Sequence, residues 1–311
     1  MFQIKLVPAK TNIPFIHWRK PAMAISAALV LLSAVLAFTP GPNFGIDFRG
    51  GILIEVQTEG PAELRDMRAK LGGLGLGEVS LQEFGANDTV LIRIEKQPGD
   101  ATAQQKAVAK VRNALGDGLD YRRTEFVGPK VSGELIEAGA IAIALAVVLM
   151  LIYIWFRFEW HFGVGAVVAL IHDVALSIGM FAITQMEFNL STIAALLTIV
   201  GYSINDTVVV YDRVRENLRK FKTMDLAEVL NLAINDTLSR TSMTSVTTLL
   251  ALVALFVFGG AVIQGFVFAM IWGVVVGTYS SIFIAAPLLI VLGLGDRHRG
   301  GEDRGEARTS S

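Results

Sequence analysis

The chain has 311 residues, of which 53% are hydrophobic and only 18% are charged. A soluble domain with a similar apolar content carries roughly 25% charged residues, so this composition predicts an integral membrane protein with a soluble part attached. The net charge of −1 offers no basic excess for nucleic acid, and the absence of cysteine excludes a disulfide scaffold, a thiolate metal site and a cysteine nucleophile.

The first apolar stretch, at residues 21–39, has about the ~20 residues that a helix needs to cross a membrane. It follows a short N-terminal segment, 1–20, which carries basic residues. A cleaved signal peptide has a similar charge pattern. This apolar run is longer than a signal peptide requires, however, and no small-residue cleavage site precedes Pro40, so we expect a membrane helix.

Residues 40–133 have the composition of a soluble domain, and their hydrophobic periodicity changes between that of strands and that of helices. The order is strand, helix, strand, strand, helix, strand, which predicts a ferredoxin-like (β-α-β-β-α-β) α+β fold. We expect strands at 51–57, 78–84, 89–95 and 121–127, helices at 61–71 and 100–115, and a turn at Asn87 and Asp88. The glycine-rich loop at 72–77 leaves a helix and enters a strand, which is the wrong order for a nucleotide-binding loop.

Residues 134–295 supply five more apolar stretches, which makes six predicted transmembrane helices in an α-helical polytopic membrane protein. The five are expected at about 136–156, 162–184, 188–210, 241–260 and 266–293. The amphipathic segment 212–236 predicts an interfacial helix pair between two spans. Small residues in the last span (Gly273, Gly277 and Ser280) predict a face that packs closely against a partner subunit.

Lysine and arginine residues in short loops predict the orientation of the chain, because they are enriched on the cytoplasmic side. They occur before the first span, after the fourth span and in the tail at 296–311, whereas the loops at 185–187 and 259–264 contain none. Both termini are therefore expected in the cytoplasm, and the domain at 40–133 on the periplasmic side.

Ionisable residues inside the predicted spans are the strongest functional signal, because charge is costly in a membrane and usually faces the protein interior or a water path. Asp206, preceded by Asn205, lies in the fourth span, and Asp173, preceded by His172, lies near the middle of the third. We interpret Asp206 as a carboxylate that accepts protons. His172 and Asp173 fit either a second proton site or a static clamp between helices.

Arg240 stands at the start of the fifth span. The fourth and fifth spans are antiparallel, so Arg240 and Asp206 can lie at a similar depth and form a pair. Arg240 can equally be an interfacial anchor whose side chain extends to the lipid headgroups. The sequence leaves both interpretations open.

The sequence contains no clear motif for catalysis, a metal or a cofactor, and we expect none of the three. The four histidines are scattered singly, and the Walker lysine motif, His-Glu-x-x-His and Gly-x-Ser-x-Gly are absent. An intramembrane aspartyl protease is the enzymatic alternative, since Asp173 and Asp206 supply two carboxylates. Neither aspartate lies in the Gly-x-Gly-Asp motif of such enzymes.

Six segments carry a resemblance to a known family: 43–51, 127–135, 169–173, 200–217, 237–241 and 277–282. Together and in this order they resemble the SecD/SecF family of protein-export membrane proteins, of the resistance-nodulation-division superfamily, and within it the SecF-type chains. The resemblance covers residues 15–293. Its motif residues are Gly45, Asp47, Phe48, Gly50 and Gly51 after the first span, and Gly128 and Pro129 before the second.

The resemblance implies a SecF-like subunit of the Sec protein translocase, surrounded by membrane lipid in the bacterial inner membrane. Such a subunit pairs with a SecD-like subunit and works with the SecYEG channel and the SecA motor. It uses the proton motive force to assist the translocation of unfolded preprotein and its release on the periplasmic side. Asp206 and Arg240 fall on the charged in-membrane positions of this family. Half of a resistance-nodulation-division-type small-molecule transporter is the main alternative, and a structural scaffold for the translocon is another.

Overall fold

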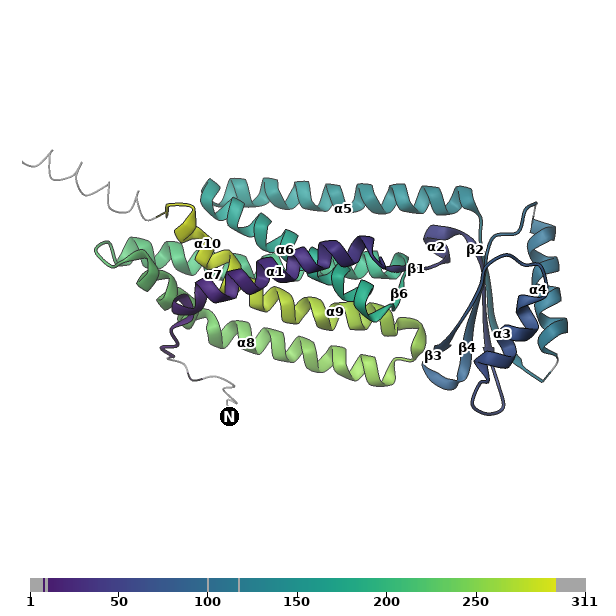
Figure 1. The fold of residues 1–311 in the computed structure, drawn as a ribbon. Coiled ribbons are helices and arrows are strands. Elements are labelled where there is room, and N and C mark those ends of the chain that lie inside the picture. The colour runs from purple at the N-terminus through teal and green to yellow at the C-terminus, as the bar shows by residue number, and fades with distance from the viewer. Residues whose placement is uncertain (1–7, 9–10, 100, 117, 295–311) are drawn as a thin grey trace, which may run out of the picture.

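The computed structural model describes residues 8, 11–99, 101–116 and 118–294, and it consists of a long helical bundle with a sheet domain at one end (Figure 1). The tail expected at 296–311 lies outside these residues. We call the end of the bundle next to the sheet domain the sheet end, and the opposite end, where α1 begins and α10 lies, the terminal end. Within the described residues, six helices are long and apolar enough to cross a membrane, so the predicted number of spans is confirmed.

The spans are longer than the apolar stretches that predicted them. A short 3₁₀ turn η1 (Phe15–Trp18) precedes α1 (Arg19–Phe38), and the other spans are α5 (Pro129–Arg157), α6 (Trp160–Thr184), α7 (Leu190–Lys220), α8 (Leu226–Phe258) and α9 (Ala261–Ser280). The last continues through a π-helical turn, η2 (Ser281–Ala285), into α10 (Ala286–Val291).

Segment 212–236 forms the expected pair of helices, but these helices are continuations of two spans. The end of α7 and the beginning of α8 make up the pair, and residues 221–225 connect them. The charged side chains of this segment lie along the outside of these helix ends, because one face of each helix still packs into the bundle. Asp225 caps the start of α8 by accepting a hydrogen bond from the amide of Ala227 at 3.1 Å.

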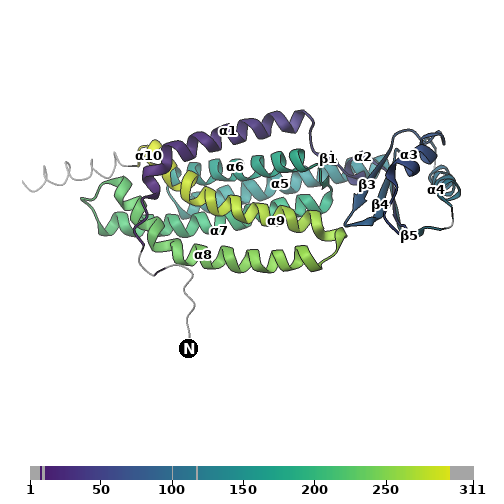
Figure 2. The same ribbon diagram turned by 60° about the horizontal axis from the view of Figure 1, so that its bottom comes forward.

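The bundle has a central layer of α6, α7 and α9, with α1, α5 and α8 around it (Figures 1 and 2). In the most apolar windows of the three central helices 50–61% of the residues are buried, against 6–11% for the three outer helices. Small residues bring the central helices together: a Cβ atom on Gly273 would collide with Ile199, and one on Gly277 would come within 3.1 Å of Ser203. The expectation that this small-residue face awaits a partner subunit is therefore wrong, because α7 already covers it.

The sheet domain contains one four-stranded antiparallel sheet and two helices. In chain order the elements are β2 (Gly51–Gln57), α3 (Leu64–Gly72), β3 (Val79–Phe84), β4 (Ala86–Ile94), α4 (Ala101–Leu115) and β5 (Asp120–Val127), and the strand order in the sheet is β3-β4-β2-β5. Alternate residues of the central strands, such as Ile52, Ile54 and Ile92, are fully buried with side chains of α3 and α4.

The turn between β3 and β4 differs from its prediction. Gly85, with φ of 75°, makes the turn, and Asn87 and Asp88 belong to β4. Glycine adopts this left-handed conformation without steric cost, so it outcompeted the Asn-Asp pair as the turn residue. The carbonyls of Asn87 and Asp88 instead accept hydrogen bonds from Ala62 and Thr58 on the strand-to-helix connection.

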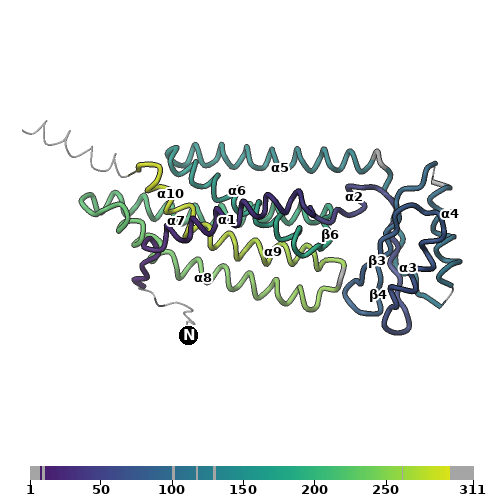
Figure 3. Tube along the Cα trace, in the orientation of Figure 1, coloured from purple at the N-terminus to yellow at the C-terminus, as the bar shows by residue number. Residues whose placement is uncertain are grey.

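Three further elements join the sheet domain to the bundle. Strand β1 (Asn43–Phe44) pairs in parallel with β6 (Glu187–Phe188), which lies in the connection between α6 and α7, and the short helix α2 (Ile46–Arg49) follows β1. Neither strand was expected from the sequence, because two residues are too few to show a period. Figure 3 traces the chain from α1 through this junction into the sheet domain.

Candidate functional site

Two aspartates lie inside the bundle on adjacent central helices. Asp173 of α6 is 0% exposed and Asp206 of α7 is 6% exposed. A carboxylate buried in this way is strongly destabilising unless hydrogen bonds compensate for the water that it has lost. The partners of the two aspartates therefore define what the site can do.

Asp173 accepts three hydrogen bonds. The Nδ1 atom of His172 lies 2.8 Å from Oδ1, and the hydroxyls of Ser203 and Ser280 donate to Oδ2 at 2.5 Å and 2.8 Å. His172 is 4% exposed, and its Nε2 atom is buried and makes no hydrogen bond among the described residues. With Nδ1 donating to Asp173, a neutral imidazole keeps the Nε2 lone pair available for a proton.

Asp206 accepts two hydrogen bonds, both from hydroxyl groups on other helices. Thr241 of α8 donates to Oδ1 at 2.6 Å, and Ser281 donates to Oδ2 at 2.5 Å. Both hydroxyl residues are buried, with exposures of 2% and 0%. Asp206 is therefore held between α8 and the C-terminal part of the sixth span.

Ser280 and Ser281 are adjacent residues that serve the two aspartates separately, at the point where α9 changes into the π-helical turn η2. Single π-helical turns within α-helices frequently occur at functional sites. Each serine also has a second acceptor: Ser280 lies 3.1 Å from the carbonyl of Gly277, and Ser281 lies 3.0 Å from that of Thr278. A hydroxyl has one proton, so each serine can donate either to its aspartate or to the backbone.

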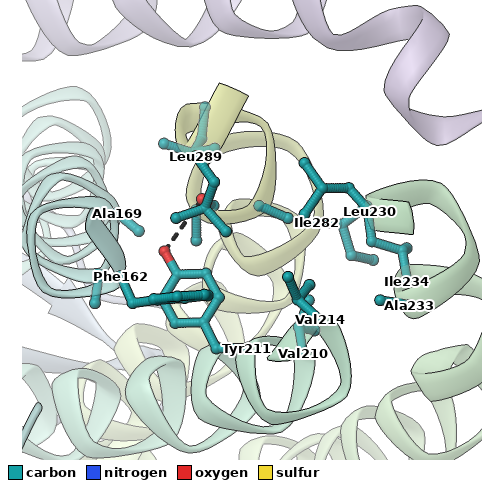
Figure 4. Close-up of a cluster of buried hydrophobic side chains, with 14 of the residues drawn as sticks. Phe162, Ala169, Val210, Tyr211, Val214, Leu230, Ala233, Ile234, Ile282 and Leu289 are labelled. Atoms are coloured by element: carbon teal, nitrogen blue, oxygen red, sulfur yellow. Dashed lines mark hydrogen bonds between the residues drawn. The ribbon is translucent and has the colours of Figure 1, made fainter. Parts of the chain in front are cut away.

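An apolar cluster closes the bundle between this site and the terminal end. Tyr211, five residues beyond Asp206 on α7, is 1% exposed and donates from its hydroxyl to the carbonyl of Ala285 at 3.1 Å. Figure 4 shows this hydrogen bond and the surrounding apolar side chains, which include Phe162, Ile282 and Leu289. The Tyr211 hydroxyl packs directly against Gly165, where a Cβ atom would collide with it. The π-helical turn is thus held at both of its ends.

The remaining candidates from the sequence do not join the two aspartates. Arg240 is exposed on α8, and no ion pair or hydrogen bond joins it to Asp206 within the described part of the chain. The neighbouring residue Thr241 makes the contact instead. Asn205 is exposed on α7, on the outside of the bundle.

The glycines of the motif after the first span lie at the junction with the sheet domain. Gly50 and Gly51 have φ of 73° and 127°, which side chains oppose, and a Cβ on Gly51 would come within 2.5 Å of the carbonyl of Ile94. Gly45 packs so closely on Glu187 that a Cβ would collide with the carboxylate.

The other motif residues begin helices or pack beside them. Asp47 accepts a hydrogen bond from the amide of Leu190 at 2.8 Å, at the first residue of α7, and Phe48 packs against Phe188 with ring centroids 5.9 Å apart. Gly128 and Pro129 stand at the N-cap and first position of α5. Asp206 lies 16 residues beyond Leu190, about 24 Å along α7, so these motif residues form a second site.

Sequence reasoning did not identify Ser203 and Thr241 as partners of the aspartates, and it assigned Ser280 and Ser281 to packing alone. One signal was available, because Ser203 precedes Asp206 by three residues and Thr241 follows Arg240. Which hydroxyl faces which carboxylate depends on how the helices are rotated, and no local pattern encodes that rotation.

Six apolar helices around two hydrogen-bonded carboxylates, with one sheet domain attached at an end of the bundle, define a polytopic membrane protein with an ionisable core. The family described as protein export membrane protein SecD/SecF, C-terminal, matches residues 107–295, and the SecD/SecF GG motif matches residues 35–62. The protein translocase subunit SecF of Rickettsia bellii is 46% identical over 94% of this chain and 97% of its own length. That of Rhodobacter capsulatus is 47% identical over 97% and 95%. The chain belongs to the SecF family of protein translocase subunits.

Two solved structures are similar to this chain. SecDF from Thermus, described as a translocon-associated membrane protein, matches with a TM-score of 0.84 and 35% identity over 92% of this chain. SecDF in a super-membrane-facing form matches with a TM-score of 0.66 and 34% identity over 98%. This chain spans 39% and 41% of the lengths of those two SecDF chains.

Proposed function

We propose that this SecF-family chain couples the flow of protons to protein export, and that Asp206 is the residue that takes up and releases the proton. The chain works with a SecD-like subunit beside the SecYEG channel and the SecA motor, and it assists the translocation of unfolded preprotein and its release on the periplasmic side. The observation that carries the proposal is the pair of alternative acceptors available to Ser281, the carboxylate of Asp206 and the carbonyl of Thr278.

Ionised Asp206 is stabilised by the hydroxyl protons of Ser281 and Thr241, at 2.5 Å and 2.6 Å. When Asp206 is protonated, its own O–H can donate to the Ser281 oxygen, and Ser281 can turn its proton to the Thr278 carbonyl 3.0 Å away. In both protonation states the hydroxyl and carboxyl groups of the site keep a hydrogen-bond partner. A buried polar group without a partner would cost ~1–3 kcal/mol. The site is therefore suited to exchange a proton.

Asp173 and His172 form a second proton station on the same principle. His172 can bind a proton at Nε2 while its Nδ1–H still donates to Asp173, and Ser280 can turn from Asp173 to the carbonyl of Gly277. Ser280 and Ser281 are consecutive, so a shift of the backbone at one carboxylate would also move the donor of the other. A proton that crosses ~100 mV supplies about 2.3 kcal/mol, which changes the ratio of two conformations about fiftyfold.

The orientation rests on the distribution of lysine and arginine in the sequence. We assign the sheet domain, residues 40–133, to the periplasmic side and both termini to the cytoplasm, in the bacterial inner membrane. The order β2-α3-β3-β4-α4-β5 and the sheet order β3-β4-β2-β5 support a ferredoxin-like domain. Residues 134–295 then form the five remaining spans, with the ends of α7 and α8 at 212–236 in the cytoplasm.

A polar face on α7 and α8 supports a partner subunit. Within these two spans, the following residues are exposed on the outside of the chain: Ala194, Thr198, Gly201 and Asn205 on α7, and Arg240, Thr244 and Thr247 on α8. Lipid cannot satisfy an arginine or an asparagine at this position, and small residues favour close contact with another helix. We assign this face to the SecD-like subunit, where Arg240 finds its partner across the interface.

The test of the proposal is Asp206→Asn, which keeps the size of the side chain and removes its titratable proton. The variant is expressed with its SecD-like partner, and preprotein translocation into inverted membrane vesicles is measured with and without a proton gradient. We expect normal assembly and loss of the stimulation by the gradient. Asp212→Asn is the matched control, since Asp212 lies on the same helix but is paired with Arg157 at the surface. If Asp206→Asn responds to the gradient like the parent protein, Asp206 is not the coupling residue.

A further inference from the structure

The junction between the sheet domain and the bundle is built around the connection that begins α7. The amide of Gly45 donates to the carbonyl of Phe188 at 2.9 Å, and the amide of Leu190 donates to Asp47 at 2.8 Å. The amide side chain of Gln185 donates to the carbonyl of Gly41 at 2.9 Å. The segment that leaves α1 is thus hydrogen-bonded at several points to the segment that enters α7.

One side chain of the sheet domain reaches into this junction. Arg93 of β4 lies 2.7 Å from the carboxylate of Glu187 and donates to the side-chain carbonyl of Asn43 at 3.0 Å. Asn43 in turn donates to the carbonyl of Gln185 at 2.9 Å. Asn43 and Glu187 are opposite each other in the β1–β6 pair, so Arg93 contacts both strands at the same paired position.

The Arg93–Glu187 pair differs from an ordinary surface ion pair. The two side chains are only 14% and 19% exposed, whereas exposed ion pairs contribute little to stability. Gly45 supports the arrangement, since any side chain there would occupy the position of the Glu187 carboxylate. The contact with Glu187 is an ion pair without hydrogen-bond geometry, since the Nη2 atom that faces the carboxylate makes no hydrogen bond among the described residues, whereas Nη1 donates to Asn43. The hydrogen bond from the charged guanidinium to Asn43 is of the charge-assisted kind, which is stronger than a neutral one.

Helix α7 connects this junction to Asp206. Glu187 stands two residues before the N-cap Asn189, whose capping box with Thr192 fixes the first turn, and α7 runs without interruption to Lys220. A shift of Leu190 along the helix axis is therefore carried to Asp206, about 24 Å away.

We propose that Arg93 and Glu187 are positioning residues for proton-coupled export, which together fix the sheet domain to the first turn of α7. The sheet domain and the Asp206 region of α7 then move as one body, so protonation at Asp206 displaces the domain and a load on the domain acts back on Asp206. The coupling role rests on the proposed function, whereas the mechanical link is tested independently of it.

The functional test is a double-mutant cycle of Arg93→Gln and Glu187→Gln in the full chain with its SecD-like partner. Each single variant should retain assembly and gradient-independent translocation and reduce the stimulation by the gradient about tenfold, the scale of one hydrogen bond to a charged group. The double variant should be no worse than either single variant. Effects that multiply, or single variants that respond to the gradient normally, would overturn the proposal.

Arg122→Gln is the matched control, because Arg122 pairs with Asp120 on the same sheet with 46% and 71% exposed side chains, and its other side-chain partner, Gln57, also belongs to the sheet. The mechanical link has its own readout, the hydrogen exchange of the Gly45 and Leu190 amides. Arg93→Gln should raise both exchange rates about tenfold relative to the parent protein. Asp206→Asn should leave the exchange rates of these two amides unchanged. Unchanged exchange in Arg93→Gln would overturn the link. A normal gradient response of Asp206→Asn together with raised exchange in Arg93→Gln would overturn the proton role and keep the link.

Discussion

The sheet domain and the central layer of the bundle differ in the side chains that they bury. The interior of the sheet domain is apolar, with Ile52, Ile54 and Ile92 at 0% exposure. The interior of the bundle contains Asp173 and Asp206 with a set of hydroxyl donors, while many of its large apolar side chains face outward. The solvent explains the difference, because water removes apolar groups from the surface of one region and lipid removes polar groups from the surface of the other.

This comparison also separates stability from function. The sheet domain has its own apolar core, so we expect it to fold as an independent unit. The hydrogen-bonded carboxylates in the bundle can bind protons at defined atoms. Such a buried network is stable only if every donor and acceptor in it has a partner. We expect substitutions in the two regions to fail differently.

The largest effect is expected for Gly273→Val in the central layer. A Cβ at this position already collides with Ile199, so α9 has to move away from α7 and the hydroxyl donors with it. Because the two helix backbones must separate, this change goes beyond ordinary overpacking of a core, and we expect the bundle not to assemble. The measurement is the yield of monodisperse protein in detergent. Gly73→Ala in the sheet domain, where nothing lies within 4 Å of an added Cβ, is the control that should express normally.

A smaller but well-defined effect is expected for Ile92→Ala. Ile92 is fully buried between the sheet and its helices, and its truncation should lower the free energy of unfolding of the sheet domain by about 2–5 kcal/mol. Chemical denaturation of the excised fragment 43–129, followed by circular dichroism, measures the change. A parent fragment without a cooperative transition would show that the domain depends on the bundle.

Ser281→Ala sharpens the comparison in the bundle. The variant removes the hydroxyl that serves both Asp206 and the carbonyl of Thr278, so the ionised carboxylate loses one of its two donors. We expect the gradient-dependent part of preprotein translocation to fall about tenfold, the equivalent of one charged hydrogen bond. Ser281→Thr keeps the hydroxyl and should retain most of the activity. Equal activity in the alanine and threonine variants would remove Ser281 from the proton site.

The smallest effect concerns acid sensitivity of the sheet domain. The hydrogen bond from Gln57 holds the pKa of Asp88 below its ordinary value. A lowered pKa in the folded state stabilises the domain above the ordinary carboxyl pKa, and this contribution is lost as the pH falls through the folded value. Melting of the excised domain between roughly pH 2 and pH 6 should therefore show less acid dependence in Asp88→Asn than in the parent. Identical pH profiles would contradict this role.

Much of the fold was accessible from periodicity and composition. The six spans follow from apolar length, and the alternating patterns of the soluble segment indicated its strands and helices. The turn at Gly85 and the β1–β6 pair were not accessible. A two-residue strand has no detectable period. The two strands are also far apart in the sequence, since the paired residues Asn43 and Glu187 are 144 positions apart.

The candidate site divides in the same way. Asp173 and Asp206 could be singled out because a charge inside an apolar stretch is visible in one dimension and costly in a membrane. Arg240 was an equally visible charge, yet Thr241 is the residue of α8 that contacts Asp206. A rotation of one residue, about 100° around the helix, separates these outcomes, and it is decided by packing between helices.

Composition and local spacing alone were sufficient to establish a six-span membrane protein with a mixed α and β domain and ionisable groups in its spans. Only the packed structure decided the partners of those groups, since the serines that donate to Asp173 and Asp206 lie 30, 75 and 107 positions away from them in the chain. The physical reason is the distance along the chain over which each property is determined. Hydrophobic length and period depend on neighbouring residues, whereas a hydrogen bond between helices depends on the rotation, tilt and depth of both at once.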